Sequence, residues 1–173
     1  FILVLATSAL LAIAGCGGSG STTTTDSTTT ATPEVITLSG VAASGAAFVD
    51  AIIKVYDSTG VLVGTSSPVG TDGLYTVTLS SRSIPFIIIA ARTSANGVVD
   101  SLVSVAPTVD TTSINVTPVT SLLASRLSVS GDPLKLAAEV ASGTATVNAT
   151  TVASKVAEVQ QILRPILDSV GVT

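Results

Sequence analysis

Between Val35 and Thr117 the chain consists of short runs rich in β-branched residues, broken by turn signals about every eight to twelve residues. This spacing is typical of an antiparallel sandwich or barrel. The runs predict seven strands: Val35–Ala42, Ala51–Tyr56, Val61–Ser66, Leu74–Leu79, Phe86–Arg92, Val98–Val105 and Ser113–Val116. We therefore expect a mainly β fold with seven antiparallel strands.

Two of these runs differ in how their apolar residues are distributed. Tyr75, Val77 and Leu79 share one face of their run, and two threonines share the other face with Leu74. Such alternation indicates a strand with one buried face. The run at 86–91 is apolar on both faces, which is typical of a strand covered on both sides. We expect it to be central in its sheet.

The predicted turns have sequences that favour reversal of the chain. The run D-S-T-G (57–60) places an aspartate that can bond the turn backbone before a glycine, for which positive φ is inexpensive. The run T-D-G (71–73) is similar, and Asn96-Gly97 is a strong hairpin signal. We expect the turns at 57–60 and 96–97 each to close a hairpin between the flanking strands.

After Thr117 the apolar residues recur with the period of a helix. Thr117 has the character of an N-cap and Pro118 suits the first helical position. G-D-P (131–133) repeats this start signal and predicts a second short helix to about Ser142. The apolar face expected on the first helix comprises Val119, Leu122, Leu123 and Leu127.

A third helix is predicted from a regular apolar stripe, with Lys155, Glu158 and Asp168 off it. We expect this helix to pack within the chain, although a coiled-coil seam is the alternative. Pro165 removes an amide donor and predicts a kink or a break. The stripe is Val152, Val156, Val159, Leu163, Ile166 and Val170.

The composition restricts both the core and the chemistry. Because the chain has three Phe, two Tyr and no Trp or Met, the core must consist of Val, Ile, Leu and Ala. Only 10% of residues are charged, with eleven acids against seven bases. No basic surface is indicated, so we expect no nucleic-acid partner.

No catalytic constellation is recognisable in the sequence. The chain has no His, and its one cysteine is Cys16, so the usual general bases and nitrogen or sulfur metal ligands are missing from the predicted fold. The adjacent pairs Ser125-Arg126 and Ser154-Lys155 are interpreted as solvated helix faces, and Gly17–Gly20 as linker. We predict no enzyme activity, no cofactor and no metal.

Calcium is the alternative considered for four aspartates in or near predicted loops. Calcium takes oxygen ligands from flexible loops, but the chain contains no D-x-D-x-D-G spacing. Stabilisation of turns is the preferred interpretation. The four residues are Asp57, Asp72, Asp100 and Asp110.

Cys16 follows an uncharged apolar segment and precedes a polar run rich in glycine and serine. Directly before it stand Ile13, which is aliphatic, and the small residues Ala14 and Gly15. This stretch resembles the lipobox of bacterial lipoproteins. In that family a diacylglyceryl group is attached to the cysteine thiol, a peptidase cuts before it, and the new amino terminus is acylated. The resemblance implies a signal peptide at 1–15 and lipidation of Cys16.

Two alternatives for this segment are a buried thiol in a core helix and a membrane-spanning helix. Fifteen residues at about 1.5 Å rise make roughly 22 Å, which is shorter than the ~30 Å hydrocarbon core. A signal peptide fits that length better. Since the chain opens on Phe1 without Met or a basic region, we expect residues to be missing before it.

Residues 16–34 are predicted to be a lipidated cysteine followed by a disordered tether. After Cys16 the segment reads GGSGSTTTTDSTTTATPE, which offers too little apolar surface to offset the entropy of ordering. An edge strand is the alternative, because threonine favours strands. Eighteen residues of flexible chain span about 25 Å on average, so the tether would hold a folded head away from a bilayer.

Four stretches of the β region form a recognisable succession: L-S-G-V-A (38–42), A-I-I-K-V-Y-D-S-T-G (51–60), T-D-G-L-Y-T-V-T-L (71–79) and P-F-I-I-I-A-A (85–91). This succession resembles the carboxypeptidase regulatory-like or transthyretin-like β-sandwich. The resemblance implies a transthyretin-like sandwich over 35–117, followed by a helical module at 118–173. The second strand departs from the commonest family form, because five residues separate Gly45 of G-A-A-F-V (45–49) from the Ala51 run.

These features predict a lipid-anchored protein of the bacterial cell envelope with a non-catalytic binding or structural head. Its partners would be the membrane, through the lipid on Cys16, and an envelope protein or glycan. Gly17 favours the outer membrane or cell surface, because in known lipoproteins an Asp after the cysteine can retain the protein at the inner membrane. The alternative is the accessory front of a longer exported enzyme, or of an adhesin or stalk, with further domains after Thr173. The sequons N-V-T (115–117) and N-A-T (148–150) are then coincidental.

Overall fold

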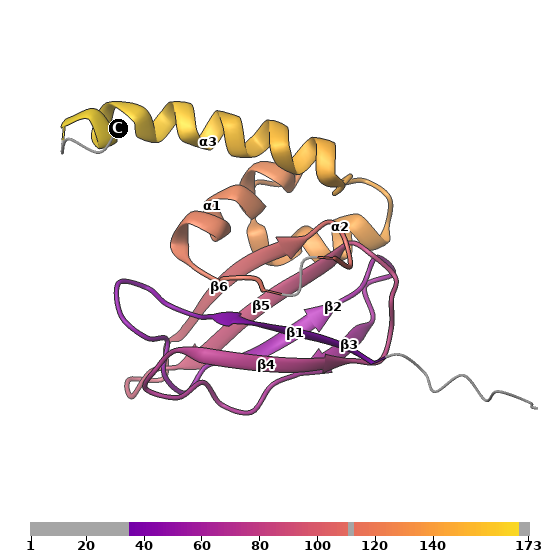
Figure 1. Cartoon of the computed structure of the whole chain (residues 1–173), viewed down its shortest axis with the longest axis vertical. Coiled ribbons are helices and arrows are strands. Elements are labelled where there is room, and N and C mark those ends of the chain that lie inside the picture. The colour runs from indigo at the N-terminus through magenta and orange to yellow at the C-terminus, as the bar shows by residue number, and fades with distance from the viewer. Residues whose placement is uncertain (1–34, 111–112, 170–173) are drawn as a thin grey trace, which may run out of the picture. The chain divides into compact units, whose positions relative to one another are not determined.

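The computed structural model describes residues 35–110 and 113–169, with the side chains of 166 and 167 excepted. This part contains six strands in two antiparallel sheets, followed by three α-helices (Figure 1). The strands are β1 (Ile36–Val41), β2 (Ile52–Tyr56), β3 (Leu62–Thr65), β4 (Leu74–Leu79), β5 (Phe86–Thr93) and β6 (Val99–Ala106). The helices are α1 (Pro118–Leu127), α2 (Leu136–Ala141) and α3 (Ala149–Ser169), with the 3₁₀ turn η1 (Pro133–Lys135) before α2.

β1 and β4 form a two-stranded sheet, and the other strands form a sheet in the order β3-β2-β5-β6. β5 lies between β2 and β6, which confirms its predicted central position. The predicted hairpins are also confirmed. D-S-T-G (57–60) joins β2 to β3 and Asn96-Gly97 lies in the turn from β5 to β6, with positive φ at Gly60 and Gly97.

The prediction of seven strands is wrong, because Ser113–Val116 is not a strand. Its residues make only isolated parallel bridges, from Ser113 to Ser39 of β1 and from Val116 to Ala42, the residue after β1. The Ile114 amide donates to the Ser39 carbonyl and the Val116 amide to the Val41 carbonyl, each at 2.8 Å. The Val41 amide donates instead to the side-chain Oδ1 of Asn115 at 3.1 Å. A side chain therefore replaces part of the backbone ladder that a strand would need.

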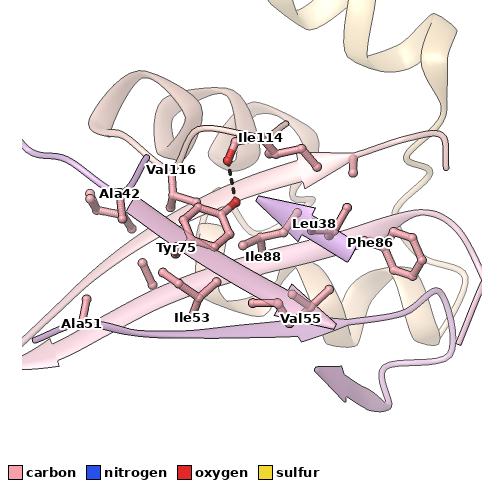
Figure 2. Close-up of a cluster of buried hydrophobic side chains, with 14 of the residues drawn as sticks. Leu38, Ala42, Ala51, Ile53, Val55, Tyr75, Phe86, Ile88, Ile114 and Val116 are labelled. Carbon is pink, nitrogen blue, oxygen red and sulfur yellow. Dashed lines mark hydrogen bonds between the residues drawn. The ribbon is translucent and has the colours of Figure 1, made fainter. Parts of the chain in front are cut away.

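β5 contributes to two hydrophobic cores, because its side chains alternate between its faces. Phe86, Ile88 and Ala90 join the first core, which contains buried residues from both sheets (Figure 2). Ile87 and Ile89 join the second core, formed with residues of β6, α1 and α2. Figure 1 shows α1 and α2 lying over β5 and β6. The expectation that this strand is covered on both faces is confirmed.

The starts of the first two helices follow the predicted capping chemistry. Thr117 and Thr120 form a reciprocal capping box, with Pro118 in the first helical position. Asp132 accepts from the Leu134 amide at 3.0 Å, and the segment behind it consists of η1 and α2 rather than one continuous helix. Val119 is 55% exposed, whereas Ala124 is fully buried. The predicted buried face of α1 is therefore wrong at Val119.

α3 packs against α1 (Figure 1), as expected of a helix with an apolar stripe. Within the stripe Val159 is buried, while Val156 is exposed. The helix continues through Pro165 to Ser169, so of the predicted kink or break the break is wrong, and the kink stays a prediction. Val170, the last residue of the stripe, lies outside the described residues.

Gly40 allows the segment 113–116 to approach β1 closely. A Cβ built at this position would lie 2.6 Å from the carbonyl carbon of Ile114 and closer still to its oxygen. Such an approach is possible only without a side chain. The glycine of the S-G-V stretch therefore has a packing role rather than a turn role.

We predict that Gly40→Ala destabilises the protein by roughly 1–3 kcal/mol, because backbone must shift to admit the methyl group. Denaturant unfolding measures this loss. Gly70→Ala is the matched control, since its Cβ would meet only the carboxylate oxygen of Asp72, at 3.2 Å. Equal stability of Gly40→Ala and the unaltered protein would contradict the close packing.

Candidate functional site

The predicted lipidation site lies outside the described residues. This applies to Cys16 and to the lipobox residues Ile13, Ala14 and Gly15, as well as to the predicted signal peptide and tether. Within the ranges 35–110 and 113–169, no helix is long and apolar enough to cross a membrane. The functional geometry that the structure describes is therefore that of residues 35–110 and 113–169, which we call the head.

Asp57 is buried, with 5% of its surface exposed, and its carboxylate organises the turn from β2 to β3. Its Oδ1 accepts from the Thr59 amide at 2.9 Å, the Thr59 hydroxyl at 2.6 Å and the Val61 amide at 3.2 Å. Its Oδ2 accepts from the Ser81 hydroxyl at 3.1 Å. Burial by itself would raise the pKa of Asp57, but these hydrogen bonds outweigh it and hold the pKa below its ordinary value.

The other aspartates considered for calcium have separate local roles. Asp72 accepts from the Leu74 amide at 3.0 Å. Asp100 lies 3.6 Å from the Nε of Arg92, whose guanidinium rests over the Phe48 ring at 4.2 Å. Asp110 is exposed. No group of three or more His, Cys, Asp or Glu residues that could hold a metal occurs among the described residues.

Ser125 and Lys155, from the two serine–cation pairs, and both sequon asparagines already have hydrogen-bond or ion-pair partners within the fold. Ser125 donates to the Leu122 carbonyl at 2.7 Å, and Lys155 pairs with Glu158 at 2.7 Å. Asn148, directly before α3, accepts from the Thr151 amide at 2.9 Å, and the Asn148 amide donates to the Thr151 hydroxyl at 2.9 Å. Asn148 therefore caps a helix, while Asn115 accepts from β1 as described above.

Tyr75 is the polar centre of the first core, with 5% of its surface exposed. Its hydroxyl donates to the Ile114 carbonyl at 2.5 Å, as Figure 2 shows. Burial raises the pKa of Tyr75 well above its ordinary value. Sequence alternation placed Tyr75 on a buried face but did not identify this partner, although a buried tyrosine hydroxyl generally needs one.

Two hydroxyl groups of α1 bond the free edge of β6. The Thr120 hydroxyl donates to the Val103 carbonyl at 2.8 Å, and the Val103 amide donates to the Ser121 hydroxyl at 2.8 Å. Side chains thus satisfy the backbone groups that an edge strand leaves unpaired. This contact could not be predicted from sequence pattern, because it joins residues 17 and 18 positions apart.

Glu139 of α2 binds the loop that follows α1. Its carboxylate accepts from the Val129 amide at 2.9 Å and from the Ser130 amide at 3.0 Å. The Ser130 hydroxyl makes the largest contribution to lowering the pKa of Glu139 to about 2, and Ser128 and the two amides add to it. Glu139 is half-buried in the structure, and its sequence neighbours form no motif that would single it out.

No protein-family model matches the chain, and neither does any curated protein or any solved structure. The resemblances to bacterial lipoproteins and to the transthyretin-like sandwich stay predictions. In the head, the polar groups described above bond turns, helix caps and a strand edge.

We predict that Tyr75→Phe destabilises the protein by about 1–3 kcal/mol, because the buried Ile114 carbonyl loses its donor. The substitution also changes the dependence of stability on alkaline pH. Above a pH of about 10 the unfolded chain releases the tyrosine proton while the folded protein retains it, so stability falls as pH rises. Denaturant unfolding between neutral and alkaline pH measures both effects. Tyr56→Phe is the control. If the free energy of unfolding of Tyr75→Phe fell with alkaline pH as steeply as that of the unaltered protein, the buried Tyr75 hydroxyl would not be the cause.

We predict that Glu139→Gln lowers stability at neutral pH and has progressively less effect under acid conditions. The folded pKa of about 2 lies below the unfolded value of 4.5. The carboxylate therefore contributes stability that is present above 4.5 and is lost as pH falls through about 2. Urea unfolding of Glu139→Gln and of the control Glu158→Gln, which removes only the i,i+3 pair with Lys155 on α3, measures the difference at neutral and acid pH. If the loss of stability in Glu139→Gln were the same at neutral and acid pH, the charge of the Glu139 carboxylate would not be its cause.

Proposed function

We propose that this chain is a lipid-anchored protein of the bacterial cell envelope. The observation that carries the proposal is the sequence L-A-I-A-G-C (11–16), in which Ile13, Ala14 and Gly15 precede the chain's one cysteine. An uncharged apolar segment before Cys16 and a polar run after it have the order of a signal peptide, a lipidation site and a spacer. Gly17 favours the outer membrane or cell surface.

The spacing between the proposed anchor and the head supports a tethered arrangement. Ile36, the first residue of β1, stands twenty positions after Cys16 (36 − 16). A flexible chain of this length has a root-mean-square span of about 25 Å. The head would stand clear of the lipid headgroups while remaining confined to a thin layer beside the membrane.

We further propose that the two sheets form a transthyretin-like sandwich. Residues of β1 and β4 share the first core with residues of β2, β3 and β5, which supports this arrangement. The motif residues also have defined structural roles in it: Gly40 admits the Ile114 carbonyl, Asp57 closes a turn, and Tyr75 bonds Ile114. The helices would cover the opposite face of the larger sheet.

The proposed role of the head is binding or structural presentation without catalysis. Asp57 and Glu139, the carboxylates with lowered pKa values, accept hydrogen bonds that hold a turn and a loop. A general base works best with a pKa near the working pH, and the hydrogen bonds lower the pKa of both carboxylates, which opposes that task. The alternative is that the head is the accessory front of a longer exported enzyme, adhesin or stalk.

We predict that labelled palmitate is incorporated into the protein in a bacterial host and that Cys16→Ser abolishes the incorporation. The physical reason is that the thiol of Cys16 is the proposed attachment point. The lipid-free variant should also move from the membrane to the soluble fraction. Ser19→Ala, in the polar run, is the control that retains the label. Labelled Cys16→Ser, or unlabelled parent protein, would exclude this function.

A further inference from the structure

The turn between β5 and β6 contains an asparagine directly before a glycine, and both Asn96 and Gly97 are exposed. Gly97 has a φ of 80°, and a Cβ built on it would meet nothing within 4 Å. Because glycine has no side chain, the backbone nitrogen of Gly97 is open to approach by a reacting group. The other two asparagines of the chain, Asn115 and Asn148, precede a valine and an alanine, whose Cβ atoms hinder approach to the corresponding nitrogen.

Hydrogen bonds hold the Asn96 side chain over the turn. Its Oδ1 accepts from the Ser94 hydroxyl at 2.5 Å and, through a longer bond, from the Val98 amide at 3.4 Å. The same hydroxyl also lies 2.8 Å from the Val98 carbonyl, to which it can donate instead. Since Ser94 and Val98 stand on either side of the pair, the carboxamide of Asn96 is folded back toward the Gly97 peptide.

An asparagine in this position can react with the backbone that follows it. The Gly97 nitrogen attacks Cγ of Asn96, a C–N bond forms, the Cγ–Nδ2 bond breaks, and ammonia leaves with the proton of the Gly97 amide. Water then opens the resulting cyclic imide at one or the other carbonyl, which gives aspartate or isoaspartate. In isoaspartate the main chain runs through the side-chain carbon. Either product adds one negative charge to the formal net charge of −4.

The contacts of Asn96 favour this reaction at one atom and oppose it at another. During the attack negative charge develops on Oδ1, and hydrogen-bond donors already aimed at that oxygen stabilise it. Ser94 and Val98 supply such donors, and a carboxamide held beside the nitrogen loses less entropy in reacting. Against this, the Gly97 amide donates to the Ser94 carbonyl at 2.9 Å, and that bond must break as the nitrogen loses its proton. The reaction should therefore accelerate with rising pH.

We propose that Asn96 is a site of spontaneous deamidation in the folded protein, and that the Ser94 hydroxyl promotes the reaction. The co-reactant is water, and no enzyme or cofactor takes part. The products lie in the turn between β5, which is central in its sheet, and β6, which is at the edge. Because isoaspartate lengthens the main chain within this turn, the modification alters the connection that sets the register of the hairpin. This inference goes beyond the proposed anchoring and does not depend on the lipid.

The experiment incubates the folded full chain at neutral and mildly alkaline pH and follows each asparagine by peptide mass spectrometry after digestion under acid conditions. We expect deamidation at Asn96 to exceed that at Asn115 and Asn148 at every time point and to accelerate with pH. The two comparison asparagines bond elsewhere, since Asn115 accepts from the Val41 amide and Asn148 from the Thr151 amide. Equal or greater deamidation at either of them, or none at Asn96, overturns the proposed site.

Two variants test the role of Ser94. Ser94→Ala removes the donor to Oδ1 and should slow deamidation of Asn96 severalfold, whereas Ser94→Thr retains a hydroxyl and should retain the rate. In denaturing urea the rates of the two variants should converge, because the contact with Oδ1 is lost on unfolding. Equal rates in the folded variants, or a difference that persists in urea, overturn the role of Ser94.

Gly97→Asp is the matched variant for the attacking nitrogen. It adds a Cβ at a positive φ that aspartate tolerates better than most residues, and it should slow the reaction at Asn96 in the folded and the unfolded chain alike. An unchanged rate overturns the attack by the Gly97 nitrogen. Circular dichroism establishes that all three variants are folded. Failure of palmitate labelling would overturn the anchoring alone.

Discussion

The backbone carbonyl of Ile114 is held between Gly40 and Tyr75, and the arrangement of the head depends on this contact. A buried carbonyl without a donor is costly, and the Tyr75 hydroxyl provides the donor. Gly40 provides the space, because a side chain at that position would occupy the place of the carbonyl. Since Gly40 and Tyr75 are paired across β1 and β4, one cross-strand pair both admits and bonds the segment. Neither residue could perform this role without the other.

The same contact determines where the helical part begins. The segment held by Gly40 and Tyr75 leads directly into Thr117, the cap of α1. Three and four residues further along, Thr120 and Ser121 bond Val103 on the edge of β6. The start of α1 is therefore attached to both sheets, at β1 through the segment and at β6 through hydroxyl groups. The buried Ile87 and Val103 then supply the apolar surface on which α1 and α2 pack.

Local chemistry explains what could be predicted from the sequence. The alternation in Leu74–Leu79 and the two-sided apolar run at 86–91 depend on side chains within one strand, and both predictions are confirmed. Ser113–Val116 is predicted as a strand because Ile114 and Val116 are β-branched, and the structure buries both. Its pairing, however, depends on Asn115, whose side chain bonds a strand more than seventy residues away. The exposure of Val119 depends on how α1 packs on β6, which the helical period alone does not determine. Pro165 lies in an exposed stretch of α3, and no described residue around it explains why the helix continues there. The predicted site at Cys16 lies outside the described residues. The hydroxyl of Tyr75 bonds a residue 39 positions away, and Glu139 bonds across a loop, so neither contact follows from local sequence pattern.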